Sequence, residues 1–295
     1  MAIKIGIAPL TWTNDDLPEL GGDISFEQCI FEMAEAGYSG CEIGNKFPRD
    51  PEVLLAALKP HGLVIVSQWC SSHFTVPGRE EETVVRFKEH MHFLKAMGAK
   101  LINVCEKGGS IQGKAVPILG DQKPIFDNQQ WKSLTNGLDS LGRLAKENGM
   151  RLEYHQHMGT GVQTETELDR LMHNTDPAYV DLLFDTAHIV FAGMNPLEII
   201  QRHGDRIGHV HLKDIRLRIL DSVKDKQMSF LDCVRAGAFT VPGDGDLSMK
   251  PITDALIKDG FDGWFVVEAE QDPAKATPLT YAIKGRHYIR ETTGL

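Results

Sequence analysis

The stretch Val180-Asp-Leu-Leu-Phe-Asp185 is an apolar run about as long as one β-strand, and it ends in a carboxylate. Three other runs in the second half of the chain contain, at or near their ends, a residue that can bind a divalent metal. These are Glu153 in Arg151-Leu-Glu-Tyr-His-Gln-His157, His211 in His209-Val-His-Leu-Lys-Asp214 and Glu268 in Trp264-Phe-Val-Val-Glu-Ala-Glu270. This repetition predicts parallel strands whose ends meet at one site.

Strand-like runs recur along the whole chain. The eight of them span residues 3–9, 40–44, 63–69, 101–105, 151–157, 180–185, 207–212 and 264–268. Helical patterns lie between them: Ser25 and Gln28 are predicted to form a capping box, and Gly37 to end that helix. Because strands and helices alternate and no glycine-rich dinucleotide fingerprint follows the first strand, we predict an α/β fold, a closed (β/α)8 TIM barrel, over residues 1–295.

The predicted barrel indicates where the chemistry lies, because functional residues in this fold follow the carboxyl ends of the strands. Four side chains meet this condition: Glu153, Asp185, His211 and Glu268. Carboxylates with one imidazole suit a hard divalent ion that keeps positions open for substrate. On the last strand, Glu270 lies one pleat further out and is the alternative to Glu268. Any one of these residues alone could simply be a polar group at a wet strand end.

Composition and charge narrow the class of protein. A formal net charge of -10 argues against nucleic acid as a partner, because backbone binding needs clusters of Lys and Arg. The five cysteines are far apart and form no CxxC, which is typical of buried thiols in a reducing compartment. No apolar stretch is long enough to cross a membrane. We therefore expect a cytoplasmic protein that acts on a small molecule, with no membrane partner.

Two long segments, 108–128 and 216–246, follow strand ends and are rich in Gly, Pro and charged residues. Long connections of this kind in a compact domain usually carry function. We interpret both as active-site loops.

Several motifs resemble those of the xylose-isomerase-like barrels, a superfamily that includes endonuclease IV, sugar epimerases and sugar dehydratases. They are Phe184-Asp-Thr-Ala-His188 with Gly193, His209-Val-His-Leu-Lys-Asp214 and Gly263-x4-Glu268. Further stretches narrow the resemblance to the inosose dehydratase family of myo-inositol catabolism, from about residue 3 to residue 290. Those stretches are Gly6-Ile-Ala-Pro-Leu-Thr-Trp-Thr-Asn-Asp-Asp16, Pro18-Glu-Leu-Gly-Gly-Asp23, Ala36-Gly-Tyr-Ser-Gly-Cys-Glu42, Lys46-Phe-Pro48, His155-Gln-His157-Met-Gly159 and Glu268-Ala-Glu-Gln-Asp-Pro273.

This resemblance implies a hydro-lyase that removes water from 2-keto-myo-inositol (scyllo-inosose) to give a trihydroxycyclohexane-1,2-dione. It implies manganese or cobalt as the metal and adds glutathione as a candidate cofactor. A divalent ion suits the reaction, because it can stabilise the enolate formed when the α-proton leaves. A homo-oligomer is compatible with the resemblance, and the sequence leaves the oligomeric state open.

Other residues are assigned to the site by their positions. His157, His155 and Lys213 are the candidates for base, acid or hydroxyl-binding group, with support of the metal ligands as the alternative. A second set is expected to contact substrate: His188, Trp12, Lys107 and Lys46. For these the alternatives are a structural role for His188, solvated strand-end charge for the lysines and a plug at the top of the barrel for Trp12.

Other functions on the same barrel stay open at this point. A ketose epimerase or isomerase would use Glu153 and Glu268 as paired proton-transfer groups, and a dehydroshikimate dehydratase would be another hydro-lyase. A DNA-repair endonuclease would need a basic groove, which the acidic composition disfavours. A non-enzymatic sugar-binding or metal-binding protein is the alternative from a different class.

Overall fold

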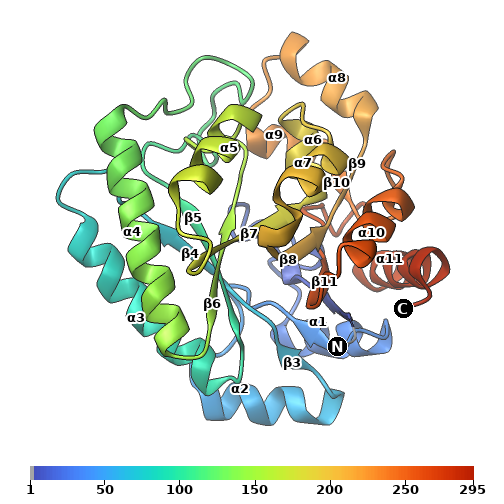
Figure 1. Ribbon diagram of the computed structural model, residues 1–295. Helices are drawn as coiled ribbons and strands as arrows, with labels where there is room; N and C mark the ends of the chain where they lie inside the picture. Colours follow the sequence, from blue (N-terminus) through green and yellow to red (C-terminus); the bar gives the residue numbers. More distant parts are fainter. Residues whose placement is uncertain (1–2) are drawn as a thin grey trace.

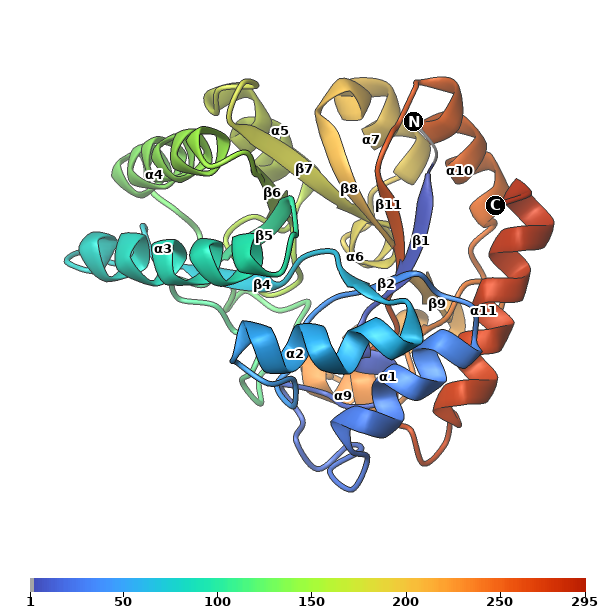
Figure 2. The ribbon, with the colours of Figure 1, turned by 90° about the horizontal axis from the view of Figure 1, so that it is seen from below.

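The computed structural model describes residues 3–295, which contain a curled, nine-stranded parallel sheet in the order β3-β2-β1-β11-β8-β7-β6-β5-β4. Its strands are β1 (Lys4–Ile7), β2 (Gly40–Cys41), β3 (Val64–Ile65), β4 (Trp69–Ser72), β5 (Leu101–Glu106), β6 (Arg151–His155), β7 (Val180–Asp185), β8 (Ile207–Leu212) and β11 (Trp264–Val267). Figures 1 and 2 show helices around the outside of these strands. The prediction of an α/β barrel is confirmed.

The third predicted strand, residues 63–69, is split into β3 and β4, which stand at the two ends of the sheet order. The chain between them still bonds to both neighbouring strands. Ser67 O accepts from Ile43 N at 3.3 Å, and Gln68 O accepts from Asn103 N at 3.3 Å. The two short strands therefore act as one barrel strand and join the two sides of the sheet.

The outer helices are α1 (Phe26–Glu35), α2 (Pro51–Leu58), α3 (Glu80–Ala96), α4 (Asn128–Glu147), α5 (Glu165–Asn174), α7 (Pro196–His203), α10 (Met249–Lys258) and α11 (Pro278–Thr293). Short 3-10 turns occupy Pro9–Thr11, Lys59–His61 and Gly204–Arg206. Helix α1 begins as predicted, with the Ser25 side chain accepting from Gln28 N at 3.2 Å, and the chain turns at Gly37 with φ 84°. The reciprocal half of the predicted capping box is wrong, because the Gln28 side chain donates to Glu32 at 2.9 Å instead.

The segment 216–246 is an ordered subdomain and not a simple loop. It contains α8 (Leu217–Asp225), α9 (Phe230–Arg235) and β10 (Phe239–Thr240), which pairs antiparallel with β9 (Asp214–Ile215). Phe230 and Phe239 are fully buried, and the helix α8 lies at the periphery (Figure 1). The apolar side chains of this segment pack against α6 (Thr186–Phe191) and the 108–128 loop.

The 108–128 segment contains no helix or strand before α4 begins at Asn128, as expected of a loop. All five cysteines are buried and free. Among residues 3–295, no helix is long and apolar enough to span a membrane.

Candidate metal centre and active site

A cavity of about 250 Å³ opens where the strands of the barrel end. The wall on the barrel side carries Glu42, Asn103, His155, His157, His211, Glu268 and Glu270. The mouth carries Asn14, Asp15, Asp16, Gln68, Trp69, Lys107 and Gln112. Ala8, Pro9, Leu10 and Ile43 add apolar surface, so the lining combines converging polar side chains with an apolar part, which fits a small polar ligand.

Asp185, His211 and Glu268 lie close together, as their positions at the ends of β7, β8 and β11 predict, and His211 and Glu268 border the cavity. With His155 they form a group whose nearest ligand atoms all lie within 4.8 Å of one another. The Nδ1 atom of His211 is 2.5 Å from Glu268 Oε2 and 3.6 Å from Asp185 Oδ2. Asp185 Oδ1 accepts from the backbone N of Ala187 and of His188 at the start of α6, whereas Oδ2 is buried without a hydrogen-bond partner. Two imidazoles and two carboxylates that converge on one point can hold a divalent ion.

Glu153, the predicted ligand from the fifth barrel strand, does not lie in this group, and the structure places His155 there instead. Both residues face the barrel interior, but Glu153 is one pleat deeper and pairs in register with Asp181 at the start of β7. Its carboxylate lies against Gly208 and 3.7 Å from the Nε atom of Arg151. The prediction is corrected on this point: the strand continues past Glu153, so its side chain stops short of the cavity.

The state of the His155 ring suits a ligand role. Its Nδ1 atom lies 2.6 Å from Gln156 O, to which the N–H donates, so the lone pair is on Nε2, 3.7 Å from Asp185 Oδ2. Burial lowers the pKa of His155 to about 4 against the opposing effect of Asp185, so the ring is neutral at pH 7. Neutral imidazole is the form that binds metals.

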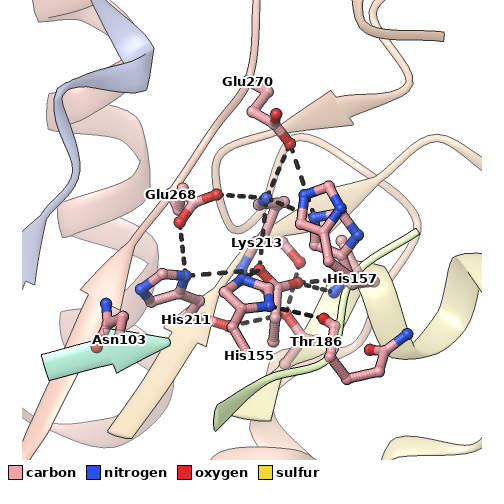
Figure 3. A network of polar contacts seen from close by, with 12 residues as sticks. Asn103, His155, His157, Thr186, His211, Lys213, Glu268 and Glu270 are labelled. Atoms are coloured by element: carbon pink, nitrogen blue, oxygen red, sulfur yellow. Dashed lines mark hydrogen bonds and ion pairs between the residues drawn. The ribbon is translucent and has the colours of Figure 1, made fainter. Parts of the chain in front are cut away.

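Lys213 lies at the centre of the acidic cluster and is fully buried (Figure 3). Its Nζ atom is 2.5 Å from Glu268 Oε1, 3.0 Å from Glu270 Oε2 and 3.4 Å from Asp185 Oδ2. Burial disfavours the ammonium, but these three carboxylates outweigh it and raise the pKa of Lys213 above its usual value. Lys213 is thus a fixed cation and does not border the cavity.

Lys213 and the carboxylates around it determine one another's charge. Burial opposes ionisation of Glu268, yet Lys213 and then His211 lower the pKa of Glu268 to about 2. For Glu270 burial prevails over Lys213 and raises the pKa to about 7. The structure therefore separates the two carboxylates of the last strand: Glu268 belongs to the group with Asp185 and His211, and Glu270 does not.

Glu270 groups with His157 and His188 on the other side of Lys213. The rings of His157 and His188 lie 3.9 Å apart, and both contact Phe230 from α9. His157 borders the cavity and donates from Nδ1 to Met158 O at 2.8 Å, which leaves a lone pair on Nε2. Burial is the main cause that lowers the pKa of His157 well below its usual value. A neutral ring with an open nitrogen can accept a proton.

His188 does not border the cavity, because His157 lies against it and its Nε2 atom is 3.2 Å from Lys213 Nζ. The structure therefore places it behind the site and not at the expected substrate contact. Lys107 does border the cavity, next to Trp69 and Gln112.

Trp12 and Lys46 lie away from the cavity, contrary to expectation. The Trp12 indole is fully buried in the core and donates to Glu32 at 2.6 Å. Lys46 donates to three backbone carbonyl groups, those of Gly21, Gly22 and Ile24, and so holds the chain before α1. Both side chains form hydrogen bonds with residues about 20 positions away in sequence. The position of a residue at a strand end does not predict such contacts.

Glu42 is a site residue that the sequence analysis missed. It follows β2 directly, so the rule that identified Asp185 would also have identified it. Its Oε1 atom accepts from His211 Nε2 at 3.1 Å, His209 Nε2 at 3.0 Å and Asn103 Nδ2 at 2.8 Å. The hydroxyl of Ser67 donates to the same oxygen.

Comparison with known proteins identifies the family. Residues 30–292 match the model of the xylose isomerase-like TIM barrel. The chain is 56% identical to an inosose dehydratase of Geobacillus thermodenitrificans over 293 residues, covering 99% of this chain and 98% of that protein. An inosose dehydratase of Clostridium tetani is 52% identical over the same shares of both chains. The chain belongs to the inosose dehydratase family.

Solved structures share the fold of this inosose dehydratase family member at much lower identity. The IOLI protein, solved with a bound zinc atom, superposes with a TM-score of 0.73 at 16% identity and covers 99% of this chain and 100% of its own. A probable 3-DHS dehydratase of Bacillus anthracis gives a TM-score of 0.71 at 16% identity, covering 97% of this chain and 98% of its own. At this identity the likeness supports the barrel alone. The family membership itself makes the chain an enzyme of the hydro-lyase class.

Proposed function

We propose that this protein removes water from scyllo-inosose with one divalent metal ion held by His155, Asp185, His211 and Glu268. The convergence of the four side chains carries the proposal, because one ligand atom from each of them lies within 4.8 Å of the others. Asp185 Oδ2 is buried without a hydrogen-bond partner and has only ion-pair contacts, with Lys213 at 3.4 Å and His211 at 3.6 Å. A metal ion would supply the missing partner. The relatives at 52–56% identity, named inosose dehydratases, supply the substrate class.

The donor set fits a divalent transition metal. With His155 in place of Glu153, two nitrogens and two carboxylates face the point where the ion would lie, a borderline set that suits manganese, cobalt or zinc better than calcium. The bound ion would act as a Lewis acid on the ketone and stabilise negative charge on its oxygen. The zinc atom in the IOLI protein shows that a related barrel binds such an ion.

His157 is the proposed base. It borders the cavity, and its Nε2 lone pair is free because Nδ1–H is committed to Met158 O at 2.8 Å. In the reaction this nitrogen takes the proton from the carbon next to the ketone, and the C–H electron pair becomes the enolate. Phe230 and Trp69 contact the His157 ring and fix its plane.

Glu270 is the proposed acid, since it is the other cavity-lining carboxyl beside Lys213. As the enolate electron pair returns to form the C=C bond, the C–O bond to the β-hydroxyl breaks, and the proton of Glu270 goes to the leaving oxygen to give water. The proton taken by His157 then returns to Glu270 through solvent, and the enol product tautomerises to the dione. Lys213 stays charged throughout and holds both glutamates in place.

The identity of the metal, a second cofactor, the location and the oligomeric state are part of the same proposal. We expect manganese or cobalt to support turnover, and glutathione remains a prediction from the resemblance. A cytoplasmic location and a homo-oligomeric state are also predictions, while the substrate is a small polyol ketone.

The test is turnover of scyllo-inosose by metal-stripped protein to which Mn²⁺ or Co²⁺ is restored. We expect the dione absorbance to appear with metal and without nicotinamide. An absolute requirement for NAD, or epimerised sugar as the product, would contradict the proposal. Binding of scyllo-inosose without any turnover would instead favour a sugar-binding protein.

A further inference from the structure

One carboxylate of the cavity wall has no role in the mechanism above. Glu42 directly follows β2, and its two oxygens have different surroundings. Oε1 receives donors from Ser67, Asn103, His209 and His211. Oε2 makes no hydrogen bond within residues 3–295, although Glu42 borders the cavity and retains 7% of its exposure.

The four donors on Oε1 fix the position of the whole group. They come from two barrel strands, β5 and β8, and from the bridge between β3 and β4, so the side chain is held from several directions. A group anchored in this way presents its second oxygen at a constant position, with little entropy left to lose on binding. An ionised carboxylate oxygen only accepts hydrogen bonds, and its natural partner in this cavity is a hydroxyl.

We propose that Glu42 Oε2 is a substrate-binding acceptor that holds one ring hydroxyl of the polyol, away from the reacting carbons. This inference rests on the proposed function. The same carboxylate also touches His211, so a competing role is to orient that imidazole for the metal. The two roles predict different losses when Glu42 is replaced. If Glu42 only orients His211, the replacement weakens metal affinity alone. If Glu42 binds a substrate hydroxyl, the replacement weakens substrate binding even when the metal site is saturated.

The first experiment is Glu42→Gln, which keeps an oxygen for the four anchoring donors and replaces Oε2 with an amide donor. Kinetics with scyllo-inosose are measured at saturating Mn²⁺, with metal dissociation constants measured in parallel. We expect kcat/KM to fall roughly 10- to 100-fold, mainly through KM, which is the scale of one hydrogen bond to a charged group. If the fall disappears at saturating metal, Glu42 only orients His211 and the proposal is overturned.

Ser67→Ala is the matched control. Ser67 donates to Oε1 and does not border the cavity, so this variant removes one anchor and leaves Oε2 in place. We expect kcat/KM within about threefold of wild type, the scale of one neutral hydrogen bond. A loss as large as that of Glu42→Gln would show that the anchoring alone matters.

A panel of monodeoxy-inososes provides a second readout. Wild type should discriminate strongly against the analogue that lacks the bound hydroxyl, and Glu42→Gln should lose this discrimination; equal discrimination in both proteins overturns the proposal. If Glu42→Gln does not fold, Glu42→Ala with added formate replaces it, and rescue by formate at saturating metal is the supporting result while absence of rescue overturns it. Failure of wild type to convert scyllo-inosose would overturn the proposed function itself, before any variant is compared.

Discussion

Two fully buried carboxylates of the same barrel, Glu153 and Asp185, behave in opposite ways. Burial, and then the charge of Asp181, raise the pKa of Glu153 well above its usual value, and both its oxygens lack hydrogen-bond partners. Burial also opposes ionisation of Asp185, but Lys213, His211 and His155 together lower its pKa below its usual value. One pleat of depth and one buried lysine thus separate a core carboxyl whose pKa is raised from a carboxyl of the proposed metal centre whose pKa is lowered.

The largest effect is expected from Asp185→Asn. The amide oxygen can still cap α6, since Asp185 Oδ1 accepts the two backbone N–H groups, but the charged Oδ2 is lost. We expect loss of stoichiometric metal and a fall in kcat of roughly 10³-fold or more, measured by metal analysis and turnover. Asp181→Asn on the same strand, beside Arg151, is the control and should keep near-wild-type activity.

His157→Asn tests whether the two histidines of β6 and its extension have separate roles. We expect metal affinity to be retained and kcat to fall roughly 10²-fold or more, the usual scale for a general base. Both quantities are measured on the same preparation. Weakened metal binding with near-normal turnover of the loaded protein would instead make His157 a support of the metal ligands.

Lys213→Met tests the cation that keeps Asp185 and Glu268 ionised. Removing it leaves buried carboxylates without their counter-charge, so we expect the metal-free protein to lose about 3–5 kcal/mol of unfolding free energy in urea. Added Mn²⁺ should restore part of this loss, because the ion replaces positive charge. Unchanged stability of the metal-free variant would contradict this account of Lys213.

Glu153→Gln has the smallest expected effect, and its sign depends on pH. The folded-state pKa of Glu153 is raised, so the native protein binds more protons than the unfolded chain above the usual value of 4.5. The contribution of Glu153 to the free energy of unfolding is therefore fully present below pH 4.5. It declines as the pH rises toward the folded-state pKa, by at most about 1.4 kcal/mol per pH unit. We therefore expect Glu153→Gln to match wild type near pH 4.5 and to be the more stable protein at pH 7, by urea unfolding at both values. Equal stability at both would mean that Glu153 is ionised in the fold.

The sequence was sufficient to predict the barrel and the convergence of Asp185, His211 and Glu268, because the strand ends of a parallel barrel meet at one face. It was not sufficient for the choice between Glu153 and His155, since alternation puts both on the inner face and only the register with β7 sets their depth. The sequence analysis also placed Trp12 and Lys46 at the substrate site, whereas both lie away from the cavity. Their hydrogen-bond partners lie in residues 21–32, and no local sequence pattern predicts such contacts.

Glu42 and Glu270 were within reach of the same reasoning. Glu270 was considered only as a rival to Glu268, although the lysine between them gives each a different environment. Glu42 directly follows β2, but the predicted strand ran on to residue 44, which placed Glu42 inside the strand and not at its end.

The most direct measurement is the metal content of His155→Gln and Glu153→Gln, purified side by side and dialysed against the same Mn²⁺ buffer. Glu153→Gln should retain one ion per chain with unchanged affinity. His155→Gln should bind it roughly 100-fold more weakly, or not at all, because one of four converging ligands is lost. The reverse result, full metal in His155→Gln and none in Glu153→Gln, would contradict the assignment of the centre.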